Sequence, residues 1–143
     1  MSVFVKICGL SDQQHVDSAV AAGADALGFV FAESVRKVTP GLARTISAAV
    51  PQQVKRVAVM LHPANDEWLE VLKIFEPDVL QTDAGDFDSL DVPYSVERWP
   101  VFREGGPRPD TDGTFVFEGP KSGQGETVDW SAAAGLAASG DMM

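Results

Sequence analysis

Residues 22–31 read Ala-Gly-Ala-Asp-Ala-Leu-Gly-Phe-Val-Phe, and this stretch decides the fold. Its first residues end a helical stripe of small apolar side chains, because the glycine at 23 readily takes the left-handed conformation that closes a helix. Residues 26–31 then form an apolar run, which is expected for a strand covered on both faces. A helix followed so closely by a buried strand is typical of an α/β protein with a parallel sheet.

The same alternation of helical and strand periods continues along the chain. It predicts strands over residues 3–8, 26–31, 56–61, 79–81, about 99–102 and 114–117. It also predicts helices with Ser11, Thr39 and Asn65 as N-caps, and a final Ala-rich helix that opens at residues 129–131. The segment 119–127 is rich in glycine, so we expect a loop there that is able to close over a site.

The number of strand–helix units limits the architecture. Units of about 24 residues fit the chain six times, whereas a closed (β/α)8 barrel needs about 200 residues or more. The chain is therefore either an open α/β sheet or a fold of the (β/α)8 TIM-barrel type with about six β/α units present. We expect residues 1–143 to form a single barrel-type domain that stops before strands 7 and 8.

Composition and charge exclude several classes of function. The chain carries 11 Lys and Arg against 21 Asp and Glu, a net charge of −10, which leaves no basic surface for nucleic acid or an anionic membrane. No apolar run reaches the about 18 residues of a membrane span, and the N-terminus lacks the charge order of a signal peptide. One cysteine excludes an internal disulfide, and neither His15 nor His62 has a spaced partner for a metal ion. We expect a cytoplasmic protein without a metal.

Polar residues stand where the predicted strands end. Parallel barrels carry their chemistry at the carboxyl ends of the strands, which here hold Cys8, Gln81 and Glu118. Alternation along the first strand places Lys6 and Cys8 on one face and the aliphatic residues at 3, 5 and 7 on the other. The aliphatic face should pack on helices, so Lys6 should point into the barrel, where a lysine is costly unless it meets an anion.

Each of these residues also has a purely structural interpretation. Cys8 could be a small buried hydrophobic residue, and Lys6 could be an ion-paired lysine without a chemical role. Glu118 could be a solvated carboxylate at a strand end, and Arg36 could be a surface charge in a loop. Position alone leaves both kinds of interpretation open.

Several segments match one known family when they are taken together. The most specific are Lys-Ile-Cys-Gly-Leu at 6–10, the stretch at 22–31 and Ser-Val-Arg at 34–36. Residues 56–60 and 78–81 continue the match in order, followed by Gly-Gln-Gly-Glu-Thr-Val-Asp-Trp at 123–130. Across nearly its whole length the chain resembles phosphoribosylanthranilate isomerase, the (β/α)8 enzyme of tryptophan biosynthesis.

The resemblance implies a reaction and a role for each candidate residue. The reaction is the Amadori rearrangement of N-(5-phosphoribosyl)anthranilate to 1-(2-carboxyphenylamino)-1-deoxyribulose 5-phosphate, which needs no metal or organic cofactor. The family pattern makes Cys8 the general base and Glu118 the general acid, while Arg36 holds the anthranilate carboxylate and Lys6 and Gln81 contact the substrate. A neighbouring cation favours the thiolate of a cysteine, and the apolar end of the sixth strand favours the protonated carboxyl group that an acid needs.

The chain also departs from the family pattern. Glu118 stands where the family usually has Asp, and Gln81-Thr82-Asp83-Ala84 replaces the usual Gln-Leu-His-Gly. We expect no counterpart of the family's seventh and eighth strands, whose glycine-rich turns hold the substrate phosphate. Two alternatives therefore stay open: a catalytically inactive barrel fragment that acts through association with other chains, and another phosphosugar isomerase on the same scaffold. The expected partners are a small phosphosugar and either a second copy or a complementing chain, because unpaired sheet edges favour association.

Overall fold

The computed structural model describes residues 2–107, 113–120, 131 and 141–142. Its strands are β1 (Lys6–Cys8), β2 (Ala26–Val30), β3 (Lys55–Val59), β4 (Val79–Asp83), β5 (Glu97–Arg103), β6 (Thr114–Glu118) and β7 (Asp141–Met142). The helices among these residues that span more than one described position are α1 (Gln13–Ala21), α2 (Pro40–Ile46), α3 (Asn65–Phe75) and the 3-10 helix η1 (Ala84–Asp88). Neighbouring strands are parallel, and their order in the sheet is their order in the chain.

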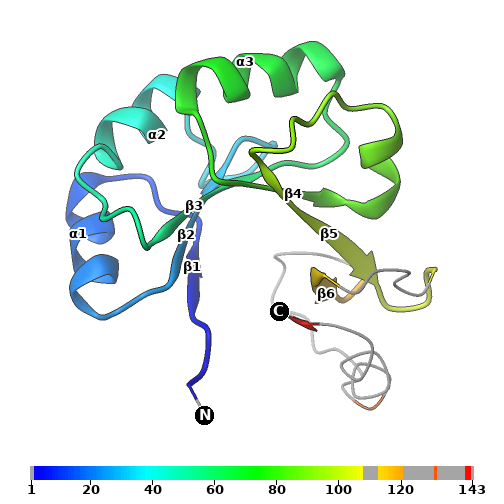
Figure 1. Ribbon diagram of the computed structural model, residues 1–143, viewed down its shortest axis with the longest axis horizontal. Coiled ribbons are helices and arrows are strands. Elements are labelled where there is room, and N and C mark those ends of the chain that lie inside the picture. The colour runs from blue at the N-terminus through cyan, green and yellow to red at the C-terminus, as the bar shows by residue number, and fades with distance from the viewer. Residues whose placement is uncertain (1, 108–112, 121–130, 132–140, 143) are drawn as a thin grey trace.

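The sheet is curved, and its helices lie on the outer side of the curve. Figure 1 shows α1, α2 and α3 along the outside of an arc, with the strands on the inside. An open α/β sheet carries helices on both faces, whereas a barrel fills its inner face with its own side chains. The described strands thus form an incomplete (β/α) barrel, which confirms the predicted barrel-type fold and decides against the open sheet.

The larger apolar core lies between the sheet and its helices. Leu27, Phe29 and Leu80 point outward from β2 and β4 and are fully buried, as are Trp68 and Phe75 of α3. The rings of Phe29 and Phe75 meet edge to face with their centroids 5.3 Å apart. Each such side chain contributes about 1.5–3 kcal/mol by leaving water, so this layer holds the helices on the sheet.

A smaller apolar cluster fills the inner side of the curve. It consists of four buried residues from successive strands, namely Ala26, Val57, Val79 and Trp99. Phe4, which precedes β1, meets the ring of Trp99 edge to face with the centroids 6.0 Å apart. This contact brings the start of β1 close to β5 across the interior, so the next inward residues along these strands also face a shared space.

The predicted helix starts are right in one case and wrong in two. Thr39 caps α2, because its hydroxyl oxygen accepts a hydrogen bond at 3.1 Å from the backbone N–H three residues on. The N-cap of α1 is Asp12 rather than Ser11, since the Asp12 carboxylate accepts from a backbone N–H at 2.8 Å. Asn65 is the first residue of α3 and not its cap, and its side chain bonds instead to the segment before β5.

The first and last strands also differ from the expectation. β1 begins at Lys6, and its outward neighbours Val5 and Ile7 stay 42% and 39% exposed because α1 covers that side only in part. β7 is absent from the predicted strands, since two residues are too few to show a period. The glycine-rich segment 119–127 and the helix at 129–131 lie outside the described residues, apart from 119–120 and 131. No helix in the described part of the chain is long and apolar enough to cross a membrane.

Candidate active site

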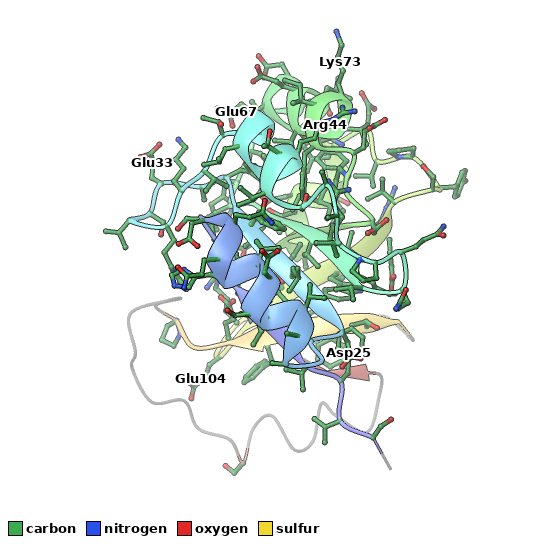
Figure 2. All side chains as sticks on the ribbon, turned by 90° about the vertical axis from the view of Figure 1, so that its left-hand side faces the viewer. Asp25, Glu33, Arg44, Glu67, Lys73 and Glu104 are labelled. Carbon is green, nitrogen blue, oxygen red and sulfur yellow. The ribbon has the colours of Figure 1, made fainter. Side chains whose placement is uncertain are left out.

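The predicted site residues lie at one end of the barrel. In Figure 2, Asp25, which precedes β2, lies to the right, whereas Glu33 and Glu104, which follow β2 and β5, lie to the left. The carboxyl ends of these parallel strands therefore share one side of the molecule. Cys8 is the last residue of β1 and Glu118 is the last residue of β6, so both belong to this side.

The amine of Lys6 is the point where the predicted residues meet. Its Nζ donates a hydrogen bond across the barrel to Oε1 of Gln81, a β4 residue that is 3% exposed. Burial lowers the pKa of Lys6, and the electrostatic fields of Cys8 and Glu118 act against this shift. The thiol of Cys8 and the carboxyl group of Glu118 therefore both act on the charge of Lys6.

Gly28 of β2 makes room for the two β1 side chains. In the sheet it is the partner of Cys8, and a Cβ at this position would lie 3.0 Å from Sγ of Cys8 and 3.2 Å from Cε of Lys6. Contacts this short are tighter than ordinary packing allows, so a larger residue would push the thiol or the amine aside. Gly28, which belongs to the 22–31 stretch, thus shapes the site as well as the fold.

Arg36 lies against the end of β1, in the loop between β2 and α2. Its Nη1 donates to the backbone carbonyl of Cys8 at 3.4 Å. Gly9 has a φ of +82°, and a Cβ there would lie only 2.5 Å from this Nη1. The Cys8 residue itself is exposed, which contradicts its interpretation as a small buried hydrophobic residue. The loop therefore brings the fifth predicted residue beside the proposed base.

Glu118 is held by an arginine that the sequence did not single out. Nη1 of Arg103 donates to Oε2 of Glu118 at 3.2 Å, while its Nη2 and Nε donate to the two carboxylate oxygens of Asp83 at 2.7 Å and 3.3 Å. The hydrogen bonds to Asp83 are the main reason why the pKa of Arg103 is raised. The apolar surroundings expected for Glu118 are thus wrong in one respect, because its carboxyl group is ion-paired.

A histidine adjoins this group from the loop after β3. Nδ1 of His62 lies 2.8 Å from Oδ1 of Asp86, and its Nε2 lies 3.5 Å from Oδ2 of Asp83. The hydrogen bond to Asp86 raises the pKa of His62. Burial alone would raise the pKa of Asp86, but hydrogen bonds from His62 and Thr82 outweigh it and lower the pKa. His62 therefore keeps its positive charge beside Asp83 to a higher pH than a free histidine would.

Two of these residues carry the sequence signal that predicts Glu118, namely charge at the end of a strand. Asp83 and Arg103 are the last residues of β4 and β5, but the signal does not show that the two form an ion pair. His62 has no such signal, because a loop brings it to the site. In the parts of the chain that the structure describes, no three His, Cys, Asp or Glu side chains are grouped to hold a metal ion.

Comparison with known sequences points to one family. The model of the family N-(5'phosphoribosyl)anthranilate (PRA) isomerase matches residues 5–142. The N-(5'-phosphoribosyl)anthranilate isomerase of Streptococcus mutans is 38% identical over 130 residues, which cover 88% of this chain and 67% of the relative. The corresponding protein of Streptococcus gordonii is also 38% identical, over 90% of this chain and 67% of its own length. The chain thus spans about two thirds of the length of these relatives.

Solved structures agree with this comparison. A phosphoribosyl anthranilate isomerase from Thermus thermophilus superimposes with a TM-score of 0.78 at 26% identity, covering 96% of this chain and 72% of that protein. Another phosphoribosyl anthranilate isomerase, solved with reduced 1-(o-carboxyphenylamino)-1-deoxyribulose 5-phosphate, has a TM-score of 0.69 at 22% identity, over 94% of this chain and 70% of that one, and so supports the fold alone. Because the family model matches residues 5–142 of the 143-residue chain, the chain belongs to the N-(5'-phosphoribosyl)anthranilate isomerase family.

Proposed function

We propose that this chain catalyses the Amadori rearrangement of N-(5'-phosphoribosyl)anthranilate to 1-(2-carboxyphenylamino)-1-deoxyribulose 5-phosphate, the isomerase step of tryptophan biosynthesis. The observation that carries the proposal is the position of Cys8 and Glu118 at the carboxyl ends of β1 and β6, with the amine-bearing side chain of Lys6 beside the thiol against Gly28. The reaction moves protons and electron pairs within one molecule, so it requires an acid and a base on the two sides of a sugar. Family membership supplies the substrate class.

The acid and the base act in turn. The carboxyl group of Glu118 gives a proton to the furanose ring oxygen, the bond from that oxygen to C1′ breaks, and a Schiff base forms at C1′. The Cys8 thiolate then removes the proton from C2′, and the electron pair left behind forms the enolamine. Tautomerisation of the enolamine gives the ketone, and no oxidant or reductant is consumed. General acid or base catalysis of this kind contributes roughly 10²–10⁴-fold for each group.

The other three predicted residues support these two. The Lys6 cation favours the thiolate form of its neighbour on β1, and its hydrogen bond to Gln81 fixes the amine in the barrel interior. The guanidinium of Arg36 can bind the anthranilate carboxylate through two parallel hydrogen bonds. Its contact with the carbonyl of Cys8 would then place the bound substrate next to the base.

Two substitutions test the catalytic assignments. Cys8→Ala and Glu118→Gln should each lower kcat by about 10²–10⁴-fold while the protein stays folded. Glu104→Gln is the matched control, because Glu104 follows β5 at the same end of the barrel and contacts Glu118 through its backbone N–H, which donates to the Glu118 carbonyl at 2.9 Å and is kept in the variant. If either test variant keeps kcat within about threefold of the unaltered chain, its assigned role is wrong.

The unaltered chain in the same assay decides between the alternatives. Turnover of N-(5'-phosphoribosyl)anthranilate supports the proposed isomerase. Turnover of a different phosphosugar alone would favour another isomerase on this scaffold, and no turnover of any phosphosugar would favour the inactive fragment.

Association through the β1 side of the barrel accompanies this proposal. In the described part of the chain β1 pairs only with β2, and an apolar groove of about 390 Å³ runs beside it. The groove is lined by residues beside β1, by one face of α1 and by the turn after it, namely Val5, Ile7, Leu10, His15, Ser18, Ala19, Ala22 and Ala24. A second copy of the chain would cover this surface, so Ile7→Lys should shift a dimer to a monomer in sedimentation velocity. A monomeric unaltered chain would contradict the association.

We also propose that the protein works in the cytoplasm. Its exposed Cys8 must stay a free thiol to act as a base, and reducing compartments keep such thiols reduced. Cell fractionation followed by immunodetection tests this location, and recovery of the protein outside the cytoplasmic fraction would contradict it.

A further inference from the structure

Three charged residues occupy the ends of three neighbouring strands. Asp83 ends β4, Arg103 ends β5 and Glu118 ends β6. Arg103 and Glu118 are register partners across the β5–β6 pair, so their side chains leave the sheet side by side. Their side chains are 25% exposed each and that of Asp83 is 19% exposed, so all three are mostly withdrawn from solvent.

Arg103 donates more hydrogen bonds to one of the two carboxylates than to the other. Asp83 receives two of its N–H groups, at 2.7 Å and 3.3 Å, whereas Glu118 receives one, at 3.2 Å. A two-point contact between a guanidinium and a carboxylate is both stronger and more directional than a single hydrogen bond. Asp83 therefore fixes the position of Arg103, and Arg103 in turn fixes the carboxyl group of Glu118.

We propose that Asp83 and Arg103 are positioning residues for Glu118: Asp83 engages two N–H groups of the guanidinium, and a third N–H of Arg103 orients the Glu118 carboxyl group. This inference rests on the proposed acid role of Glu118. It also accounts for the Glu that stands where the family pattern has Asp. The longer side chain has one more rotatable bond, and the contact with Arg103 restricts that freedom.

Substitution of Asp83 and substitution of Arg103 should change the protonation of Glu118 in opposite directions. In Asp83→Asn the amide carries no charge, so Glu118 becomes the only anion paired with Arg103 in this group, and the cation favours its carboxylate form more strongly than in the unaltered chain. In Arg103→Met the cation is lost, and Glu118 takes up a proton more readily but is no longer held in one place. Among the described residues, the charged groups that bear on Glu118 are Arg103, which is ion-paired with it, Asp83 on the other side of that arginine, and His62 beyond Asp83, while Glu118 itself acts on the charge of Lys6.

The test is the pH dependence of kcat. Asp83→Asn should lower kcat at neutral pH by about tenfold, a fraction of what general acid catalysis contributes, and should move the pH of maximal kcat downward. Arg103→Met should move that maximum upward, and in both variants KM should change less than about threefold. The control is Asp88→Asn, the same change at an exposed position of η1, which should leave the profile where it is.

A double-variant comparison separates this inference from the proposed function. If Asp83 acts through Glu118, adding Asp83→Asn to Glu118→Gln should lower kcat no further. Equal losses in both backgrounds, or an unchanged profile in Asp83→Asn, would overturn the positioning role while leaving the acid role intact. A Glu118→Gln variant with full activity would overturn the proposed function, and this inference with it.

A measurement without turnover provides the second readout. The Nε–H group of Arg103 bonds to Asp83, so its side-chain signal in a ¹H–¹⁵N NMR spectrum should exchange slowly with water in the unaltered chain. The signal should persist in Asp88→Asn and exchange rapidly in Asp83→Ala, which removes both acceptor oxygens of Asp83. Slow exchange in Asp83→Ala would show that another group holds the arginine and would overturn the inference, even for a chain that turns over no substrate.

Discussion

Gly9 offers a test of how the backbone positions Arg36. Gly9 has a φ of +82°, and a Cβ there would lie 2.5 Å from Nη1, 2.6 Å from Cδ and 2.8 Å from Cζ of Arg36. Gly9→Ala should therefore have two separate effects, one on the backbone and one on the guanidinium. Gly23→Ala isolates the first, because Gly23 has a similar φ of +87° with nothing within 4 Å of the added Cβ.

The sizes of the two effects follow from the geometry. A left-handed conformation costs a residue with a Cβ about 1–2 kcal/mol. The loss of unfolded-state freedom offsets about 0.4–1 kcal/mol of this, so each variant should lose about 1 kcal/mol of unfolding free energy. In Gly9→Ala the Arg36 side chain must also move. The displaced guanidinium should lose one hydrogen bond to the carboxylate of a bound ligand. A hydrogen bond to a charged group is worth about 1.5 kcal/mol at the low end of its range, which suits this exposed side chain, and this corresponds to a roughly tenfold higher dissociation constant for the ligand.

Urea denaturation and ligand titration measure the two effects separately. Both variants should show the same loss of unfolding free energy. Of the two glycine variants, only Gly9→Ala should bind reduced 1-(o-carboxyphenylamino)-1-deoxyribulose 5-phosphate about tenfold more weakly, and Arg36→Ala should lose at least as much affinity without the backbone destabilisation. If Gly23→Ala weakens binding as much as Gly9→Ala does, or if Gly9→Ala binds normally, then the close approach of Arg36 to Gly9 does not position this arginine for a substrate carboxylate.

Three further substitutions test other parts of the structure. Phe75→Ala removes a fully buried ring and should lower the unfolding free energy by about 3–5 kcal/mol, whereas Val35→Ala, at a fully exposed position, should change it by less than about 0.5 kcal/mol. Arg56→Met removes a guanidinium that donates to three protein oxygens at 2.8–3.0 Å and should cost about 2 kcal/mol in the same urea experiment; a loss below about 0.5 kcal/mol would mean that water replaces these bonds. Because Asp86 raises the pKa of His62, the stabilisation by this pair is complete below the ordinary histidine value of 6.5 and disappears as the pH rises through the folded-state value. His62→Gln should therefore lower Tm more at about pH 5.5 than at about pH 8.5, and an equal loss at both would contradict the pairing.

The sequence predicts the barrel because the signals for it are local. The strands at 26–30, 55–59 and 114–118 contain apolar runs at 26–30, 57–59 and 115–117, and Thr39 caps α2 through its hydroxyl oxygen. The N-cap of α1 is less predictable, because Ser11 and Asp12 are both good capping residues and adjacent. The carboxylate takes the cap in the structure. Alternation along β1 correctly places Lys6 inside, but it cannot show that Val5 and Ile7 remain partly exposed, since their burial depends on what packs beside α1.

The candidate site divides in the same way. Cys8, Gln81 and Glu118 follow from the rule that strand ends carry the chemistry, and Arg36 follows from a family motif. The ion pair that holds Glu118 does not, because Asp83, Arg103 and Glu118 are 20 and 15 residues apart in the chain and meet only through the parallel register. Charge at a strand end is visible in a sequence, but the partner of each charge depends on which strand lies next to it.

The position of the site within the barrel has a physical cause. Near the amino ends of the strands the inward residues are apolar and touch across the interior, as Phe4 and Trp99 do. Two residues further along β1 the inward residue is Lys6, and its partner on β4 is Gln81 rather than another valine. A cation there is stable only because hydrogen-bond acceptors and anions surround it on the carboxyl side, since the apolar layer below offers no partner. The apolar layer on the inner side of the curved sheet therefore confines these charged and polar groups to the carboxyl ends of the strands.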